Sequence, residues 1–171
     1  KLVDDQDCEV PDGEPGEIAI RSPALFSGYW NNPQINNQDF RGGWFHMGDM
    51  FRRNPDGTLA FVDRRKYLIK SGGENIYPAE LERIILSDPR VIEVAVVRQK
   101  DAQWGEVPIA FIARKVKSLD VAAIEDLLNG RIASYKRPKG IQFIAEADFP
   151  RSTTGKIMRH LLENRLKRAV D

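Results

Sequence analysis

The chain has 171 residues, of which 42% are hydrophobic and 30% are charged, and its formal net charge at pH 7 is +1. This composition is that of a globular protein, and the near-neutral balance gives no reason to expect a nucleic-acid or membrane-surface partner. No apolar run reaches the ~18 residues of a membrane span, and the single cysteine, Cys8, excludes an internal disulfide and favours a reducing, cytoplasmic location.

The first third of the chain predicts strands and turns. Alternation in residues Gly16–Ser22 predicts a strand, and the polar segment Asn31–Phe40, with a proline near its start, predicts a short helix. Residues Gly42–Arg53 are interpreted as a turn followed by two strands. The Pro-Asp-Gly sequence within Asn54–Gly57 predicts a tight turn, after which Thr58–Arg64 completes a hairpin. We therefore predict a β subdomain here.

The remainder alternates between helical and strand patterns. The predicted helices are Pro78–Ser87, Ser118–Gly130 with Ser118 as N-cap, and Gly155–Val170. The predicted strands are Val91–Gln99, Val107–Lys115 and Gly140–Glu146. With a short strand before the first helix, this order predicts a compact α+β domain of about 105 residues, which is large enough to fold alone.

We place the boundary between the two parts at the basic run Arg64–Lys66, which gives a β subdomain over residues 1–64 and an α+β domain over residues 65–171. The fold class is therefore α+β. By composition alone, three consecutive basic residues at a strand end are a solvated charge cluster.

The segment PRSTTGKIMRH, residues Pro150–His160, places Lys156 directly after Gly155 in a loop of small residues. A phosphate-binding P-loop requires a glycine five residues before its Gly-Lys pair and a serine or threonine after the lysine. Those positions hold Pro150 and Ile157, so the P-loop interpretation fails. The segment is either a solvated turn or a loop that delivers one positive charge.

Four segments, in this order and spacing, carry a resemblance to a known family. They are GYWNNP…GGWFHMGD, VDRRKYLIKSGGENIYPAELE, YKRPKGIQFI and FPRSTTGKIMR. From about Gly16 to Arg168 the chain resembles the C-terminal third of the adenylate-forming superfamily. Its members are acyl- and aryl-CoA synthetases, peptide-synthetase adenylation domains and beetle luciferases.

The resemblance implies two half-reactions. A carboxylate attacks the α-phosphate of Mg-ATP to give an acyl-adenylate and pyrophosphate, and a thiol, usually coenzyme A, then releases AMP. Between the two steps the small C-terminal domain rotates about a hinge. The predicted boundary at Arg64–Lys66 coincides with that hinge.

Three residues near the boundary match nucleotide and hinge positions of the family. Asp49 matches the aspartate that binds both ribose hydroxyls, a role that suits a carboxylate because its two oxygens accept two O–H donors. Arg64 matches the arginine at the ribose and phosphates, and Lys66 matches the hinge, which needs no charge. Without the resemblance, these would be a turn residue, a surface arginine paired with Asp63 and a solvated lysine.

A second group matches family positions that contact coenzyme A. Its members are Ser71, Gly72, Gly73, Trp104, Tyr135 and Lys136. The two glycines lie in the loop that lines the pantetheine tunnel, where a missing Cβ lets the backbone approach a thiol arm. Trp104 stands where several relatives have arginine and either stacks on adenine or packs without function.

The PRSTTGK segment resembles the family loop Pro-(Arg/Lys)-(Thr/Ser)-x-(Thr/Ser)-Gly-Lys, with Ser152 where threonine is common. The resemblance makes Lys156 the catalytic lysine of adenylation and a contact of ATP and AMP. Two unit anions ~4 Å apart repel by about 4 kcal/mol at an effective dielectric constant of ~20. One ammonium group between the carboxylate and the α-phosphate removes much of that repulsion.

Other family parts are not found in this sequence. They are the Gly/Ser/Thr-rich phosphate loop, the acyl pocket and the acidic residue associated with Mg²⁺, all of which we expect upstream. His46 and His160 have no visible metal-ligand partners, so we expect no metal site in this chain. The segment SGGENIYPAELE resembles the form of this motif found in CoA ligases. Peptide-synthetase domains more often carry an RG…RIELGEIE form.

We therefore expect the C-terminal fragment of an ATP-dependent acid–CoA ligase, inactive alone. Its substrates and cofactors are a carboxylic acid, ATP with Mg²⁺, and coenzyme A, and its partner is the N-terminal domain of the same protein. Two alternatives stay open. The chain could belong to an adenylation domain that loads a carrier-protein thiol, or to a non-catalytic module that binds a nucleotide or a protein.

Overall fold

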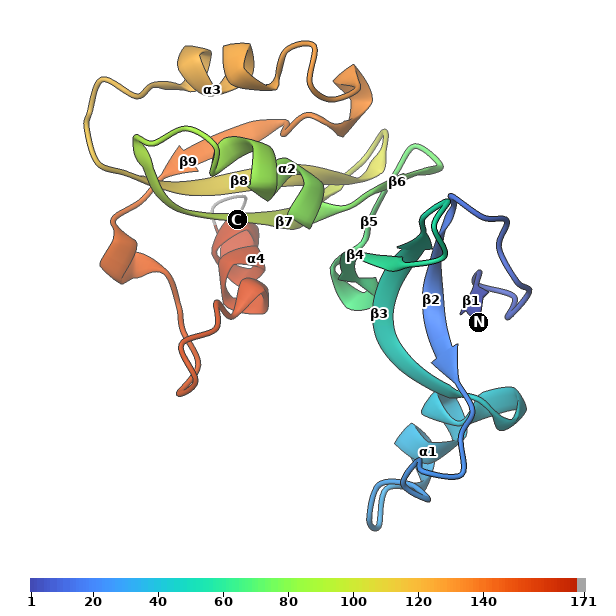
Figure 1. Cartoon of the computed structure of the whole chain (residues 1–171). Coiled ribbons are helices and arrows are strands. Elements are labelled where there is room, and N and C mark those ends of the chain that lie inside the picture. The colour runs from blue at the N-terminus through green and yellow to red at the C-terminus, as the bar shows by residue number, and fades with distance from the viewer. Residues whose placement is uncertain (169–171) are drawn as a thin grey trace. The chain divides into compact units, whose positions relative to one another are not determined.

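The computed structural model describes residues 1–168 and divides the chain into two compact units, Lys1–Lys66 and Tyr67–Asp171 (Figure 1). Each unit has its own sheet. The predicted boundary after residue 64 lies two residues before this division. Its role as a hinge stays a prediction.

The first unit is built on a four-stranded antiparallel sheet in the order β1-β2-β3-β4. The strands are β1 (Leu2–Val3), β2 (Pro15–Ile20), β3 (Phe45–Arg53) and β4 (Leu59–Arg64). The prediction of two strands within residues 42–53 is wrong, because β3 runs unbroken. It pairs with β2 on one edge and β4 on the other, and the register shift in the β2–β3 ladder shows that β3 is bulged rather than divided.

The predicted short helix is confirmed as α1 (Pro33–Asp39). The Asn32 side chain accepts a hydrogen bond from the Ile35 N–H at 3.3 Å, and Pro33 occupies the first turn, where its missing N–H costs nothing. Asn36 accepts from the Tyr29 N–H and donates to the Tyr29 carbonyl. The helix therefore holds the preceding loop in place.

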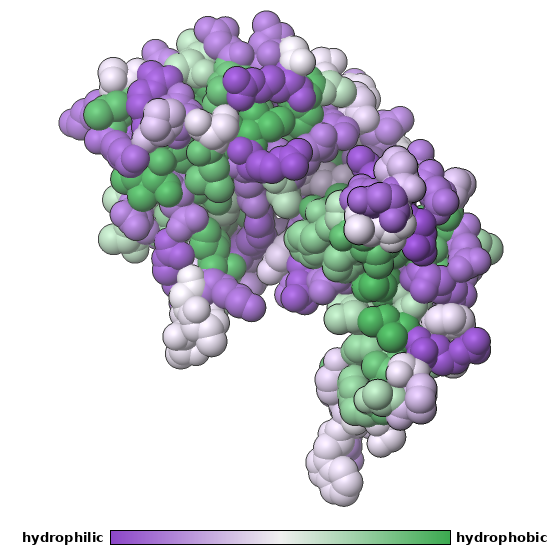
Figure 2. All heavy atoms as spheres, viewed as in Figure 1, coloured by the Kyte–Doolittle hydropathy of each residue, from purple (hydrophilic) through white to green (hydrophobic). Residues whose placement is uncertain are grey.

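An aromatic cluster lies at the end of this unit that carries α1. Phe26 contacts the rings of Tyr29, Phe40 and Phe45 edge to face, with centroids 5.1–5.2 Å apart. Figure 2 shows hydrophobic atoms gathered on the surface there. Such ring pairs add about 0.5–1.5 kcal/mol each beyond their burial, so they stabilise a part of the unit that has little buried core.

The second unit contains a five-stranded sheet in the order β6-β5-β8-β7, with β9 parallel to β8. The strands are β5 (Ile69–Ser71), β6 (Glu74–Ile76), β7 (Val91–Asp101), β8 (Gly105–Arg114) and β9 (Gly140–Phe143). The strands predicted at 91–99 and 107–115 are confirmed, and the strand predicted at 140–146 is confirmed over residues 140–143. The hairpin partner β6 was not predicted.

Helices cover both faces of the β7–β8 ribbon (Figure 1). They are α2 (Pro78–Ile85), α3 (Val121–Leu128) and α4 (Arg159–Arg168). Val94 and Val96 point into one core with Leu81 of α2 and side chains of α3, whereas Ala95 and Val97 point into another with Leu162 of α4. This alternation follows from the period of two in a strand.

Two predicted helix starts are wrong. Helix α3 begins at Val121 and is capped by Asp120 rather than Ser118, because the Asp120 carboxylate accepts the Ala123 N–H at 2.9 Å. Helix α4 begins at Arg159 rather than residue 155, since residues 151–157 form a turn of their own. The predicted helical residues 169 and 170 lie outside the described residues.

Within residues 1–168, no helix combines the length and the apolar character needed to cross a membrane.

A partly buried ion pair covers the free edge of β7 at Val96. Glu82 of α2 accepts the Val96 N–H at 2.7 Å, and Arg159 of α4 donates to the Val96 carbonyl at 2.6 Å. Arg159 also donates to Glu82 at 2.8 Å and stacks over the Tyr67 ring. Because β7 is an edge strand, these side chains supply the hydrogen bonds that a neighbouring strand would otherwise make.

We expect Glu82→Ala to lower the free energy of unfolding by about 3 kcal/mol, because it leaves the Arg159 charge buried without its carboxylate and Val96 without its acceptor. Glu125→Ala, in the exposed face of α3, should change it by less than about 0.5 kcal/mol. Urea denaturation of the 171-residue chain measures both. Equal midpoints for the two variants would contradict the role given to Glu82.

Candidate functional site

Asp49 and Arg64 face one another across the β3–β4 ladder of the first unit, where their Cα atoms are register partners. Arg64 Nε lies 2.7 Å from Asp49 Oδ1, and the Asp49 side chain is 15% exposed. The contact is an ion pair without hydrogen-bond geometry, since Asp49 Oδ1 accepts no hydrogen bond from residues 1–168. The structure thus brings two predicted nucleotide residues together and leaves a carboxylate oxygen able to accept from a hydroxyl group.

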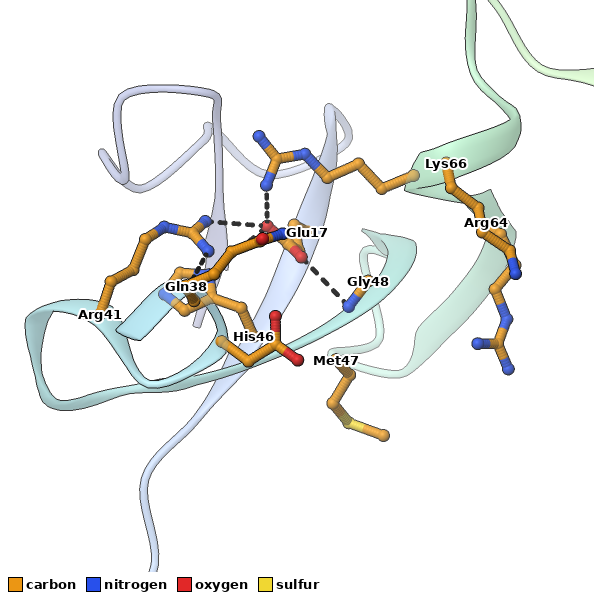
Figure 3. A pocket seen from close by; sticks show the side chains of 10 residues that line it. Glu17, Gln38, Arg41, His46, Met47, Gly48, Arg64 and Lys66 are labelled. Atoms are coloured by element: carbon orange, nitrogen blue, oxygen red, sulfur yellow. Dashed lines mark hydrogen bonds and ion pairs between the residues drawn. The ribbon is translucent and has the colours of Figure 1, made fainter. Parts of the chain in front are cut away.

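A buried carboxylate organises the residues beside this pair. Glu17 of β2 is 3% exposed and accepts hydrogen bonds from the Gly48 N–H at 3.1 Å, from Arg41 at 3.0 Å and from Arg65 at 2.6 Å (Figure 3). His46 Nδ1 lies 3.4 Å from the same side chain. A buried charge needs such partners, so Glu17 fixes the chain on either side of Asp49 and Arg64.

At the outer part of this network, the carboxylate of Asp7 pairs with the guanidinium group of Arg41. Arg41 also binds Asp7, and that side-chain hydrogen bond lowers the pKa of Asp7 below its ordinary value. Burial acts to lower the pKa of Arg41, but its hydrogen bonds to Asp7 and Glu17 outweigh burial and raise it. Both groups therefore stay charged across the physiological range.

A pocket of about 620 Å³ opens beside the network. Its lining includes Glu17, Arg41 and His46 together with Arg64 and Lys66. Arg64 points away from Glu17 in Figure 3, and Lys66 lies exposed in the short 3-10 turn Arg65–Tyr67. The predicted hinge residue therefore lines the same pocket as the predicted nucleotide arginine.

Sequence reasoning missed Glu17, which was read only as part of a strand. The local sequence carries no signal for it. Alternation in this segment would turn the apolar Ile18 and Ile20 inward and Glu17 outward, whereas in the structure Glu17 and Ala19 are the buried pair.

Four of the predicted coenzyme A residues lie together in the second unit. Gly72 and Gly73 form the two-residue turn between β5 and β6, with φ of +58° and +88°, which side chains rarely adopt. The Gly72 N–H donates to the Trp104 carbonyl at 2.8 Å, and a Cβ on Gly72 would lie 2.7 Å from Trp104 Cε3. Ser71 is buried and pairs with Gly105, so the turn and the half-exposed indole form one surface.

Tyr135 and Lys136 lie in a separate place, the 3-10 turn Ser134–Lys136. Lys136 Nζ donates to Glu80 of α2 at 2.8 Å, and Tyr135 is exposed. Among residues 1–168, neither side chain makes a hydrogen bond or ion pair with the Gly72 turn or Trp104. The structure therefore does not join the two halves of the predicted coenzyme A group.

Lys156 stands on a closed turn that precedes α4. Ser152 N–H donates to the Lys156 carbonyl and the Gly155 N–H to the Ser152 carbonyl, both at 2.9 Å, while the Lys156 N–H donates to Ser152 Oγ at 3.2 Å. Gly155 has φ of +81°, which suits glycine. The Lys156 side chain is exposed and makes no hydrogen bond or ion pair within residues 1–168. Its backbone is fixed and its ammonium group is available.

No group of three His, Cys, Asp or Glu side chains in the described part of the chain is arranged to hold a metal ion.

Comparison with known proteins identifies relatives of the whole chain. Residues 80–156 match the family model described as AMP-binding enzyme C-terminal domain. The chain is 41% identical over 160 residues to indoleacetate–CoA ligase of Aromatoleum aromaticum, which covers 93% of this chain and 31% of that protein. It is 37% identical over 171 residues to a long-chain-fatty-acid–CoA ligase of Escherichia coli, with coverages of 100% and 30%.

A solved structure agrees with these sequence matches. ATP-bound MatB from Rhodopseudomonas palustris superposes with a TM-score of 0.88 at 33% identity, over 99% of this chain and 34% of that one. The chain thus spans about a third of the length of the relatives that it matches. The chain carries an AMP-binding enzyme C-terminal domain, and its relatives are acyl- and aryl-CoA ligases.

Proposed function

We propose that the chain is the C-terminal part of an ATP-dependent acid–CoA ligase that forms acyl-CoA, AMP and pyrophosphate through an acyl-adenylate. The observation that carries this proposal is the Lys156 turn. On a hydrogen-bonded backbone within the matching PRSTTGK segment, it presents an ammonium group that has no partner among residues 1–168. The names of the relatives favour free coenzyme A as the acceptor over a carrier-protein thiol.

In the adenylation step, Lys156 would lie between the substrate carboxylate and the α-phosphate. A compact ammonium group on a long stem reaches both anions, and its charge stabilises the negative charge that develops as the new bond forms. Asp49 would accept the ribose hydroxyls through the oxygen that Arg64 leaves without a hydrogen bond. Arg64, half exposed at the end of β4, would contact the ribose and phosphates.

In the thioester step, the Gly72–Gly73 turn would line the path of the thiol arm. Its glycines expose backbone without side chains, and the Trp104 ring beside Gly72 offers a flat surface to an adenine or to the arm itself. Lys66 would absorb the backbone rotation between the two steps. Ser71, Tyr135 and Lys136 stay candidates for further contacts with coenzyme A.

Lys156→Ala in the full-length enzyme should lower the rate of adenylation by about 10²-fold or more, as expected for loss of a preorganised charge. Thioester formation from supplied acyl-adenylate should change far less. Pyrophosphate release measures the first step. The substrate is whichever of benzoate, indoleacetate, octanoate and palmitate the parent enzyme uses fastest. Lys117→Ala, an equally exposed lysine, is the control, and equal losses in both half-reactions would contradict the assigned role.

Asp49→Asn should raise the KM for ATP by about 10-fold or more, because hydrogen bonds to a charged acceptor contribute roughly 1.5–3 kcal/mol each. Asp12→Asn provides the matched control, since the Asp12 carboxylate is 83% exposed and pairs with Arg53 at 3.2 Å. Steady-state kinetics over a range of ATP concentrations separates KM from kcat. An unchanged KM for ATP would remove Asp49 from the nucleotide site.

The 171-residue chain alone should release no pyrophosphate from ATP and any of the four acids above. Its sequence lacks a phosphate loop, and we expect the acyl pocket to lie upstream of this chain. The same assay on the full-length protein is the positive control. Turnover by the isolated chain would refute the requirement for upstream residues.

A further inference from the structure

A second basic side chain, Arg151, holds the turn that carries Lys156. Its Nη1 donates to the Gly155 carbonyl at 3.0 Å, the last carbonyl before Lys156. Its Nη2 donates to Glu93 Oε2 on β7. One guanidinium group therefore binds the tip of the turn and the sheet at the same time, a geometry that its planar array of donors suits.

The backbone hydrogen bonds of the turn join it to itself. Arg151 and Ile157 form an isolated β-bridge, and the Met158 N–H donates to the Pro150 carbonyl at 2.8 Å. These bonds close the loop upon itself but do not tie it to the sheet. The Arg151–Glu93 contact is a side-chain link between this turn and β7.

The position of Glu93 on β7 allows its carboxylate to accept the hydrogen bond from Arg151. It precedes Ala95 and Val97 at the same strand parity, on the face of β7 that α4 covers, and it follows a register shift in the β7–β8 ladder. The Glu93 and Arg151 side chains are 26% and 37% exposed. A pair this exposed adds only about 0–1 kcal/mol to stability, so stability gives little reason for its geometry.

We propose that Arg151 and Glu93 are positioning residues for Lys156 in the adenylation step. The inference rests on the proposed function of Lys156. Arg151 holds the Gly155 carbonyl against β7 and so fixes the direction in which the Lys156 side chain leaves the turn. A displacement of the reacting groups by ~1 Å can cost ~10²-fold in rate, so a weak surface contact can have a large kinetic effect.

The full-length enzyme tests this with Arg151→Met, Glu93→Gln and the double variant. We expect Arg151→Met to lower kcat for pyrophosphate release by about 10-fold or more, with the KM for ATP within twofold of the parent. Thioester formation from supplied acyl-adenylate and the melting temperature should be nearly unchanged. The double variant should lose no more activity than Arg151→Met, because the two side chains act as one unit.

Two further variants sharpen the comparison. Arg151→Lys keeps the charge beside Glu93 but cannot bridge two acceptors as a planar fork does, so its rate should be intermediate. Arg165→Met is the matched control, since Arg165 is an exposed arginine that donates to the Asp148 carbonyl at 2.7 Å. Its adenylation rate should equal that of the parent.

Lys156→Ala in the same assay separates the two proposals. If Lys156→Ala abolishes adenylation and Arg151→Met stays within twofold of the parent, the positioning role is wrong and the proposed function stands. Additive losses in the double variant, or equal losses in both half-reactions, also overturn the positioning role. If Lys156→Ala itself adenylates at the parent rate, the proposed function fails.

Discussion

The second unit depends on one constraint, which is that both faces of the β7–β8 ribbon are apolar. Val96 and Ile112 face one side and Val97 and Phe111 the other, so neither side can be left to water. Helices α2 and α3 cover the first face and α4 the second. The chain must therefore return beneath the sheet after β9, and the Lys156 turn lies on that return path.

The charged side chains of this protein differ in how many hydrogen-bond partners they have. Glu17 is buried and Glu82 partly buried, each is bonded by arginine and by a backbone N–H, and they act as fixed points within their units. In the described residues, the Asp49 Oδ1 atom and the Lys156 ammonium group lack such bonds. Rigid surroundings and unsatisfied functional atoms together are what ligand binding requires.

Local sequence patterns predicted most elements of the fold but few of their exact ends. The strands at 91–99 and 107–115 were predictable because β-branched residues alternate there without a competing helical period. The start of α3 was not, because Ser118 and Asp120 are both good N-caps and only the Ala123 contact decides between them. The start of α4 was also missed, since helical periodicity does not reveal that Ser152 closes a turn with Lys156.

The residues of the candidate site also divide into those that the sequence predicted and those that it did not. Asp49, Arg64 and Lys156 were found through motifs, in which residue type and spacing carry the information. Glu17 and the Arg151–Glu93 pair were not, because their meaning lies in contacts between residues far apart in the chain. Glu93 and Arg151 are separated by 58 positions, and nothing local in either segment indicates the other.

The contact between Gly72 and Trp104 constrains how this surface can change over evolution. Any residue larger than glycine at position 72 would collide with the indole and would also adopt an unfavourable backbone conformation. A smaller side chain at position 104 relieves the collision but not the conformation. The two positions are therefore coupled, and a side chain at position 72 costs less where position 104 carries a smaller residue.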